Sequence, residues 1–137
     1  MSGNKPSGKT DRYWTSVENL ETAIANLSRS LALPIMNSRD LSGIIKDFEI
    51  AYELGWKTLK KYLEKEGHET QSVKETFATA YQLGYLQDEK TWLRMIQDRN
   101  LTVHTYDQEF ATELCKKIGE QYLSALNQLL SLLKKSN

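Results

Sequence analysis

The sequence is poor in residues that interrupt helices and in residues that form covalent cross-links. Among its 137 residues there are two prolines, Pro6 and Pro34, and one cysteine, Cys115. A single cysteine cannot form an internal disulfide, which favours a reducing compartment, and its apolar neighbours at helical spacing predict a buried thiol. No Asn-Gly or Asp-Gly pair marks a tight β-hairpin. Helices are therefore free to be long.

Neither sign of charge dominates. Eighteen basic residues face eighteen acidic ones, so the formal net charge is zero. A neutral chain lacks the broad electrostatic attraction of a dedicated duplex-DNA binder, and its charge does not oppose self-association. No apolar run is long enough to cross a bilayer. We therefore expect a cytoplasmic protein with no membrane partner.

The residues that hold metals and nucleotide cofactors are also scarce. The two histidines, His68 and His104, lie far apart, and no His-x-x-x-His or Cys-x-x-Cys spacing occurs. No glycine-rich phosphate loop, dinucleotide fingerprint or Gly-x-Ser-x-Gly elbow is present. We expect neither a metal nor a cofactor, and ATPase, dinucleotide oxidoreductase and α/β-hydrolase activities have no support.

Apolar residues do recur every three or four positions along most of the chain, as they do in amphipathic helices. Pro34 ends the first such stripe, Asp40 is placed to cap the second, and Gly67 lies where a left-handed residue closes it. Ser72 and Glu75 have the spacing of a capping box. The pattern predicts helices over residues 13–31, 41–63, 73–83, 88–99 and 107–134.

Short connections between these helices predict an all-α fold, an antiparallel up-and-down four-helix bundle with a short additional helix. Residues 1–11 begin with a stretch rich in Ser, Gly and Lys and are expected to be a disordered lead-in. Residues 12–135 are expected to form the bundle as one domain.

The segment with the highest density of side chains that could bind or react with a ligand runs from Arg99 to Asp107. It lies where the fourth expected helix ends and the last begins. One interpretation is a polar turn between helices. Arg99 would then complement the helix dipole, Asn100 would cap the helix end, and Asp107 would open the next helix. On spacing alone this structural interpretation is favoured, because an arginine five residues before a histidine is a loose pattern.

The other interpretation is phosphate chemistry. The forked, always charged side chain of Arg99 matches phosphate oxygens, and His104 can exchange a proton near neutral pH. Together they could cleave RNA without a metal, since a base takes the 2′-hydroxyl proton and a cation stabilises the charged intermediate. Attack by the 2′-hydroxyl needs a base, and departure of the leaving oxygen needs an acid. Each chain offers only one good histidine for these two roles. The chemistry therefore points to a two-fold homodimer with a shared cleft.

The octapeptide Arg99–Tyr106, RNLTVHTY, resembles the Arg-x4-His-x-Tyr signature of HEPN-domain proteins. More narrowly, it is similar to the nucleotidyltransferase substrate-binding, or HepT-like, branch of that family. The segments 47–64 and 92–100 also look like the second helix of that branch and its lead into the motif. The resemblance covers roughly residues 12–133.

The resemblance implies a homodimer that pairs with a minimal nucleotidyltransferase encoded nearby. In toxin–antitoxin members the motif cleaves RNA without metal, a role that maps onto Arg99 and His104, with Asn100 as the polar residue after the arginine. The partner silences such a toxin by adding AMP to the motif tyrosine, here Tyr106. The substrate is expected to be single-stranded RNA. The alternative is a non-catalytic substrate-binding subunit of a nucleotidyltransferase. The intact motif disfavours a third possibility, a bundle that only mediates interactions.

Overall fold

The computed structural model describes residues 11–104 and 107–135, and within these ranges the regular structure is entirely helical. In chain order the elements are α1 (Asp11–Ala32), α2 (Ser38–Lys65), α3 (Val73–Gln82), α4 (Glu89–His104), α5 (Gln108–Lys117), the π-helical turn η1 (Ile118–Tyr122) and α6 (Leu123–Lys134). The all-α class that the periodicity predicts is confirmed. Across the part of the chain described, none of the helices combines the length and the hydrophobicity needed to span a membrane.

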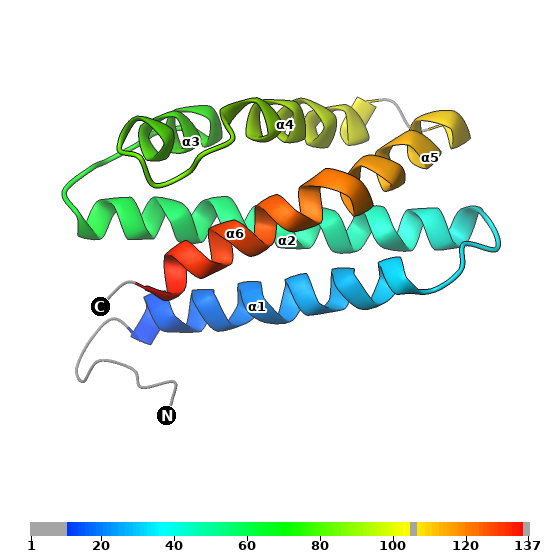
Figure 1. Cartoon of the computed structure of the whole chain (residues 1–137), viewed down its shortest axis with the longest axis horizontal. Coiled ribbons are helices and arrows are strands. Elements are labelled where there is room, and N and C mark those ends of the chain that lie inside the picture. The colour runs from blue at the N-terminus through cyan, green and yellow to red at the C-terminus, as the bar shows by residue number, and fades with distance from the viewer. Residues whose placement is uncertain (1–10, 105–106, 136–137) are drawn as a thin grey trace.

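The longest helix, α2, organises the molecule. It contacts α1, α3, α5 and α6. Figure 1 shows α1 alongside α2 on one side, α3 and α4 on the other, and the continuous rod α5–η1–α6 crossing α2 obliquely. α1, α2, α4 and this rod make the expected four-helix bundle, and α3 is the short additional helix.

The apolar stripes predicted for α1, α2 and the last rod face one another in the core. Fully buried side chains come from each of them, including Leu20, Leu27, Phe48, Leu59, Leu63, Leu114, Ile118, Tyr122 and Leu126. Each large apolar side chain buried in this way contributes roughly 1.5–3 kcal/mol. Cys115 is buried as predicted, with its Sγ 3.5 Å from the carbonyl oxygen of Leu41.

The apolar spacing within the predicted helix 88–99 selects Trp92, Leu93 and Ile96, and this selection is partly wrong. Trp92 is buried and its ring stacks on that of Phe77, but Leu93 is 37% exposed. The inner face of α4 is instead made by Trp92, Met95 and Asp98, spaced three residues apart. Because Asp98 is charged, it interrupts the apolar spacing, and this buried face is hard to recognise in the sequence.

The helix ends follow local hydrogen bonding. α2 is capped by Asn37, whose side chain accepts hydrogen bonds from the backbone N–H groups of Arg39 and Asp40. The prediction of Asp40 as the cap is therefore wrong. It occupies the third helical position and closes the capping box by accepting from the N–H of Asn37. Gly67 and Gly84 have positive φ angles of 91° and 80° just past the ends of α2 and α3, where such residues are predicted.

The last rod departs from a regular α-helix at η1. The N–H of Leu123 bonds to the carbonyl of Ile118, five residues back, which defines a π-turn. The buried residues Leu114, Ile118, Tyr122 and Leu126 follow one another at intervals of four. In an α-helix each such step overshoots a full turn by about 40°. The wider turn offsets part of this drift, and all four side chains lie in the core.

Candidate functional site

Most of the Arg99–Tyr106 segment belongs to α4 and not to a turn. α4 continues to His104, five residues past its expected end, so Asn100 lies inside the helix and cannot cap it. The turn interpretation is therefore wrong for this part of the segment. The helix can continue because it meets no glycine or proline here. Within it, the Thr102 hydroxyl lies 2.7 Å from the carbonyl oxygen of Arg99.

Arg99 points from α4 toward α2, where two glutamates one turn apart face it. Its Nη1 lies 3.7 Å from Oε2 of Glu49, and its Nη2 lies 3.9 Å from Oε2 of Glu53. The side chain of Arg99 is 22% exposed, so both ion pairs act in an environment less polar than water. They are longer than hydrogen bonds. The guanidinium is thus held by charge without committing its donors to the carboxylates.

Thr102 connects Arg99 to Glu49. Its hydroxyl accepts a hydrogen bond from Nη1 of Arg99 at 3.3 Å and lies 2.5 Å from Oε2 of Glu49. The buried Nε of Arg99 has no hydrogen-bond partner among the described residues. Arg99, Thr102, Glu49 and Glu53 are called the Arg99 cluster below. The guanidinium in this cluster retains unused donors, which is what binding of a phosphate or carboxylate ligand requires.

Tyr52 is a buried residue of α2 that immediately precedes Glu53. Burial and the charge of Glu53 together raise the pKa of its hydroxyl to about 12, and the charge of Arg99 opposes this rise. The phenol therefore stays neutral at physiological pH.

Asn100 and the backbone of His104 lie on another side of α4 than Arg99. Asn100 is exposed. His104 is the last residue of α4, five positions after Arg99, so its Cα lies about 140° around the helix axis from that of Arg99. The side chain of His104, and the whole of Tyr106, are outside the described residues. The helix thus separates Arg99 from His104 and places Asn100, one turn earlier, on the side of His104.

Exposed apolar side chains lie near Asn100 on α4. Leu93 is 37% exposed, Leu101 44% and Val103 68%. At about 100° per residue, Leu93 and Leu101 lie about 80° apart on the side of Asn100, whereas Val103 lies within about 40° of Arg99. The two leucines form a small apolar surface next to the motif. We call Leu93 and Leu101 the outer face of α4.

Glu49 and Glu53 are site residues that the sequence did not single out. Their spacing of four residues on the polar side of α2 places them on one helix face, but that spacing is common on exposed helices. The sequence does not show which residue forms ion pairs with them, because only packing of α4 on α2 brings Arg99 close. Across the described residues, no three His, Cys, Asp or Glu side chains lie close enough together to hold a metal ion.

Comparison with known proteins agrees with the geometry. A family model described as nucleotidyltransferase substrate binding protein like matches residues 15–135. The Haemophilus influenzae protein named Probable ribonuclease HepT is 31% identical over 102 residues, which are 71% of this chain and 69% of that protein. A Thermus thermophilus protein of known structure is 35% identical, with a TM-score of 0.76 over 83% of this chain and 98% of that chain.

The same fold occurs in a tri-AMPylated Shewanella oneidensis HEPN toxin in complex with MNT antitoxin. The TM-score is 0.77 at 13% identity, and the match covers 93% of this chain and 100% of that chain. At this identity the likeness concerns the fold. The family match, in contrast, spans nearly the whole helical chain and includes α4 with its motif. The chain therefore belongs to the nucleotidyltransferase substrate binding protein-like family.

Proposed function

We propose that the chain is the toxin-like member of a HEPN and nucleotidyltransferase pair and cleaves single-stranded RNA without a metal. The observation that carries this proposal is the state of Arg99. It is an immobilised, mostly buried guanidinium with an unpartnered Nε, at the start of a complete Arg-x4-His-x-Tyr motif. The 31% identity to Probable ribonuclease HepT supports the same conclusion.

The active site is proposed to form between two copies of the chain. The Cα atoms of Arg99 and His104 lie about 140° apart around α4, which favours a site that a second chain completes. The outer face of α4 offers an apolar surface that a second copy could cover. A two-fold axis beside this face would bring both motifs to one cleft and supply two histidines.

The proposed reaction is transfer within the RNA. One His104 takes the proton from a 2′-hydroxyl, and the oxygen attacks the adjacent phosphorus. The bond to the 5′ oxygen breaks as the second His104 gives that oxygen a proton. Arg99 stabilises the charge on the non-bridging oxygens. The products are a 2′,3′-cyclic phosphate and a 5′-hydroxyl, so atoms and protons balance without a metal or cofactor.

The test is cleavage of single-stranded RNA by the purified chain in EDTA. We expect cleavage by the wild type and a loss of about 10²–10⁴-fold in His104→Ala, the usual contribution of one general acid or base. Arg99→Ala is expected to lose activity as well. Glu69→Gln, at an exposed residue in the connection between α2 and α3, is the matched control. A His104→Ala protein that stays folded and fully active would overturn the proposal.

A second candidate is a non-catalytic subunit that binds substrate for a nucleotidyltransferase. Two carboxylates stand within 4.0 Å of Arg99, so the cluster carries more negative than positive charge. That balance weakens attraction for an RNA phosphate and is tolerable for a ligand delivered by a partner protein. Absence of cleavage by the unmodified wild type on every RNA tried would favour this candidate.

A further inference from the structure

The π-turn is one of the places where α4 is held against the rest of the bundle. The backbones of α4 and η1 are in contact. Tyr122, the last residue of η1, is fully buried, and its hydroxyl donates a hydrogen bond of 2.5 Å to Oδ2 of Asp98 on α4. Lys117, the residue before η1, places its Nζ 3.4 Å from the same oxygen.

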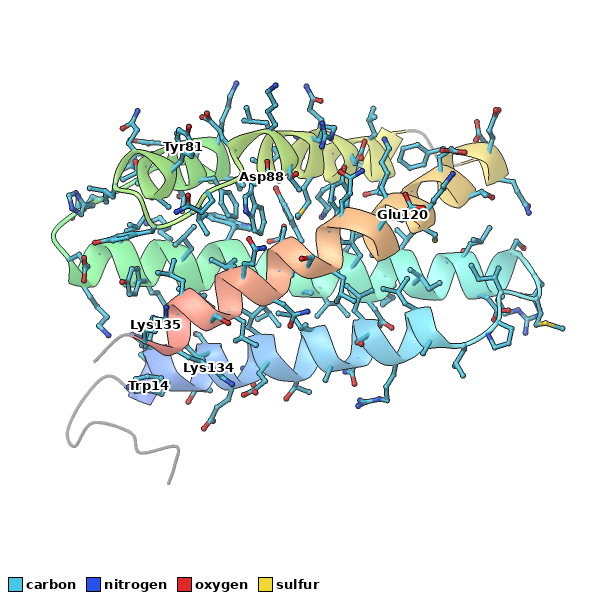
Figure 2. All side chains as sticks on the ribbon, in the orientation of Figure 1. Trp14, Tyr81, Asp88, Glu120, Lys134 and Lys135 are labelled. Carbon is cyan, nitrogen blue, oxygen red and sulfur yellow. The ribbon has the colours of Figure 1, made fainter. Side chains whose placement is uncertain are left out.

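A second contact lies one turn earlier on α4. Nη2 of Arg94 donates to Oε1 of Gln121 at 3.0 Å, so two consecutive residues of the π-turn bind α4 residues four positions apart. A regular helix would not hold the same register here, because the wider turn changes the direction of the residues that end it. Figure 2 marks the position of the π-turn by the label on Glu120.

Tyr122 also contacts α2. Its ring stacks on Phe48, with centroids 5.7 Å apart and an angle of 23° between the planes. Phe48 immediately precedes Glu49, and Asp98 immediately precedes Arg99. One buried side chain thus touches the residue before each member of the Glu49–Arg99 ion pair.

We propose that Tyr122, set by the π-turn, is a positioning residue that aligns α4 with α2 and thereby places Arg99 in its cluster. Tyr122 touches no substrate in this proposal and acts through Asp98 and Phe48. Its hydroxyl is suited to a fixed donor, because burial, together with the hydrogen bond to Asp98, raises the pKa of Tyr122 above its ordinary value. The expected loss of RNA cleavage rests on the proposed function. The expected displacement of Arg99 does not depend on it.

The test compares two tyrosines that each lose one buried hydroxyl. Tyr122→Phe keeps the ring and removes the bond to Asp98. Tyr13→Phe removes a hydrogen bond of 2.7 Å to the carbonyl of Leu133 at the far end of the bundle, where Figure 2 labels the neighbours Trp14 and Lys134. Both variants are expected to lose a similar amount of thermal stability, so stability alone does not separate them.

The decisive readout is the N–H signal of Arg99 Nε in a ¹H–¹⁵N spectrum, assigned by its loss in Arg99→Lys. We expect this signal to shift or broaden in Tyr122→Phe and to stay unchanged in Tyr13→Phe. In RNA cleavage we expect kcat to fall roughly 10- to 100-fold in Tyr122→Phe with little change in KM, as for a misplaced catalytic group, and less than about twofold in Tyr13→Phe.

Gln121→Ala is the second variant, since it truncates an exposed residue and leaves the core intact. It is expected to move the Arg99 signal in the same direction by a smaller amount. An Arg99 signal that stays in place in both Tyr122→Phe and Gln121→Ala overturns the positioning role, whatever the activity. Absence of wild-type cleavage together with a displaced signal overturns the proposed function and supports the positioning role.

Discussion

Oε2 of Glu49 on α2 lies 3.7 Å from Nη1 of Arg99 on α4 and 2.5 Å from the hydroxyl of Thr102. A carboxylate in this position both holds the guanidinium and competes with any phosphate that approaches it. The consequences of these two effects can be separated by experiment, because a glutamine keeps the acceptor for Thr102 and removes the charge.

We therefore expect Glu49→Gln to bind single-stranded RNA more tightly than the wild type. The gain is expected to be roughly two- to fivefold at low salt, the size of one partly exposed charge pair. A 2′-O-methyl oligoribonucleotide, which lacks the attacking hydroxyl, allows binding to be measured by fluorescence anisotropy without cleavage. Glu69→Gln changes the net charge equally at a distant exposed residue and controls for long-range effects. Weaker binding in Glu49→Gln would contradict this, because it would mean that the carboxylate helps RNA binding more by holding Arg99 in place than it hinders binding by competing with the phosphate.

A single cleft with two histidines predicts that one defective chain inactivates the whole dimer. When wild-type chains and His104→Ala chains are unfolded and refolded together in equal amounts, about half of the dimers are mixed and about a quarter are wild type. Each mixed dimer keeps one His104 and so lacks either the base or the acid. We expect about a quarter of the cleavage rate of an all-wild-type sample, with light scattering to confirm dimers. About half of that rate would place a complete site within each chain.

Tyr106 is expected to be the site of control by the nucleotidyltransferase partner. A phenol with a reference pKa of about 10 is neutral at physiological pH, so the partner must activate it for attack on ATP. Each AMP added brings a negative charge that can pair with Arg99 and bulk that excludes RNA. We expect mass increments of AMP and loss of cleavage after incubation with the partner, ATP and Mg²⁺. Tyr106→Phe is expected to gain no AMP, whereas Tyr81→Phe, which changes an exposed tyrosine of α3, gains it normally. AMP on Tyr106→Phe would assign control to another residue.

Alkaline pH is expected to destabilise the fold through Cys115. Burial raises the pKa of this thiol from 9.0 to about 11. Above pH 9 the unfolded chain releases the proton while the folded chain keeps it, so stability falls as pH rises toward the folded value. The slope contributed by one proton is at most about 1.4 kcal/mol per pH unit. Urea unfolding between about pH 8.5 and 10 should show a steeper loss in the wild type than in Cys115→Ser, and parallel curves would contradict this.

The helices could be predicted from the sequence because their apolar spacing is a local property. α1, α2 and the last rod bury the residues that the spacing selects. The predicted cap of α2 is displaced by three residues, since Asn37 and Asp40 can both cap a helix. The path of the chain after Pro34 decides between them.

The end of α4 and the Arg99 cluster could not be predicted, because both depend on contacts between helices. Residues 100–103 neither favour nor forbid a helix strongly. Contacts of Arg99 and Thr102 with Glu49 on α2 help to hold this last turn. The π-turn could not be predicted from the spacing of buried residues either. Three successive intervals of four also separate Ala51, Gly55, Leu59 and Leu63, which are buried in the regular helix α2.

The π-turn also restricts how this chain can change in length. Insertions and deletions are usually tolerated at loop tips, where few contacts depend on register. Deleting one residue from α5, ahead of the π-turn, would rotate the remainder of the rod by about 100° and carry the Tyr122 hydroxyl away from Asp98. Relatives that vary in length are therefore expected to do so in the connections between helices, while the length of α5 stays constant.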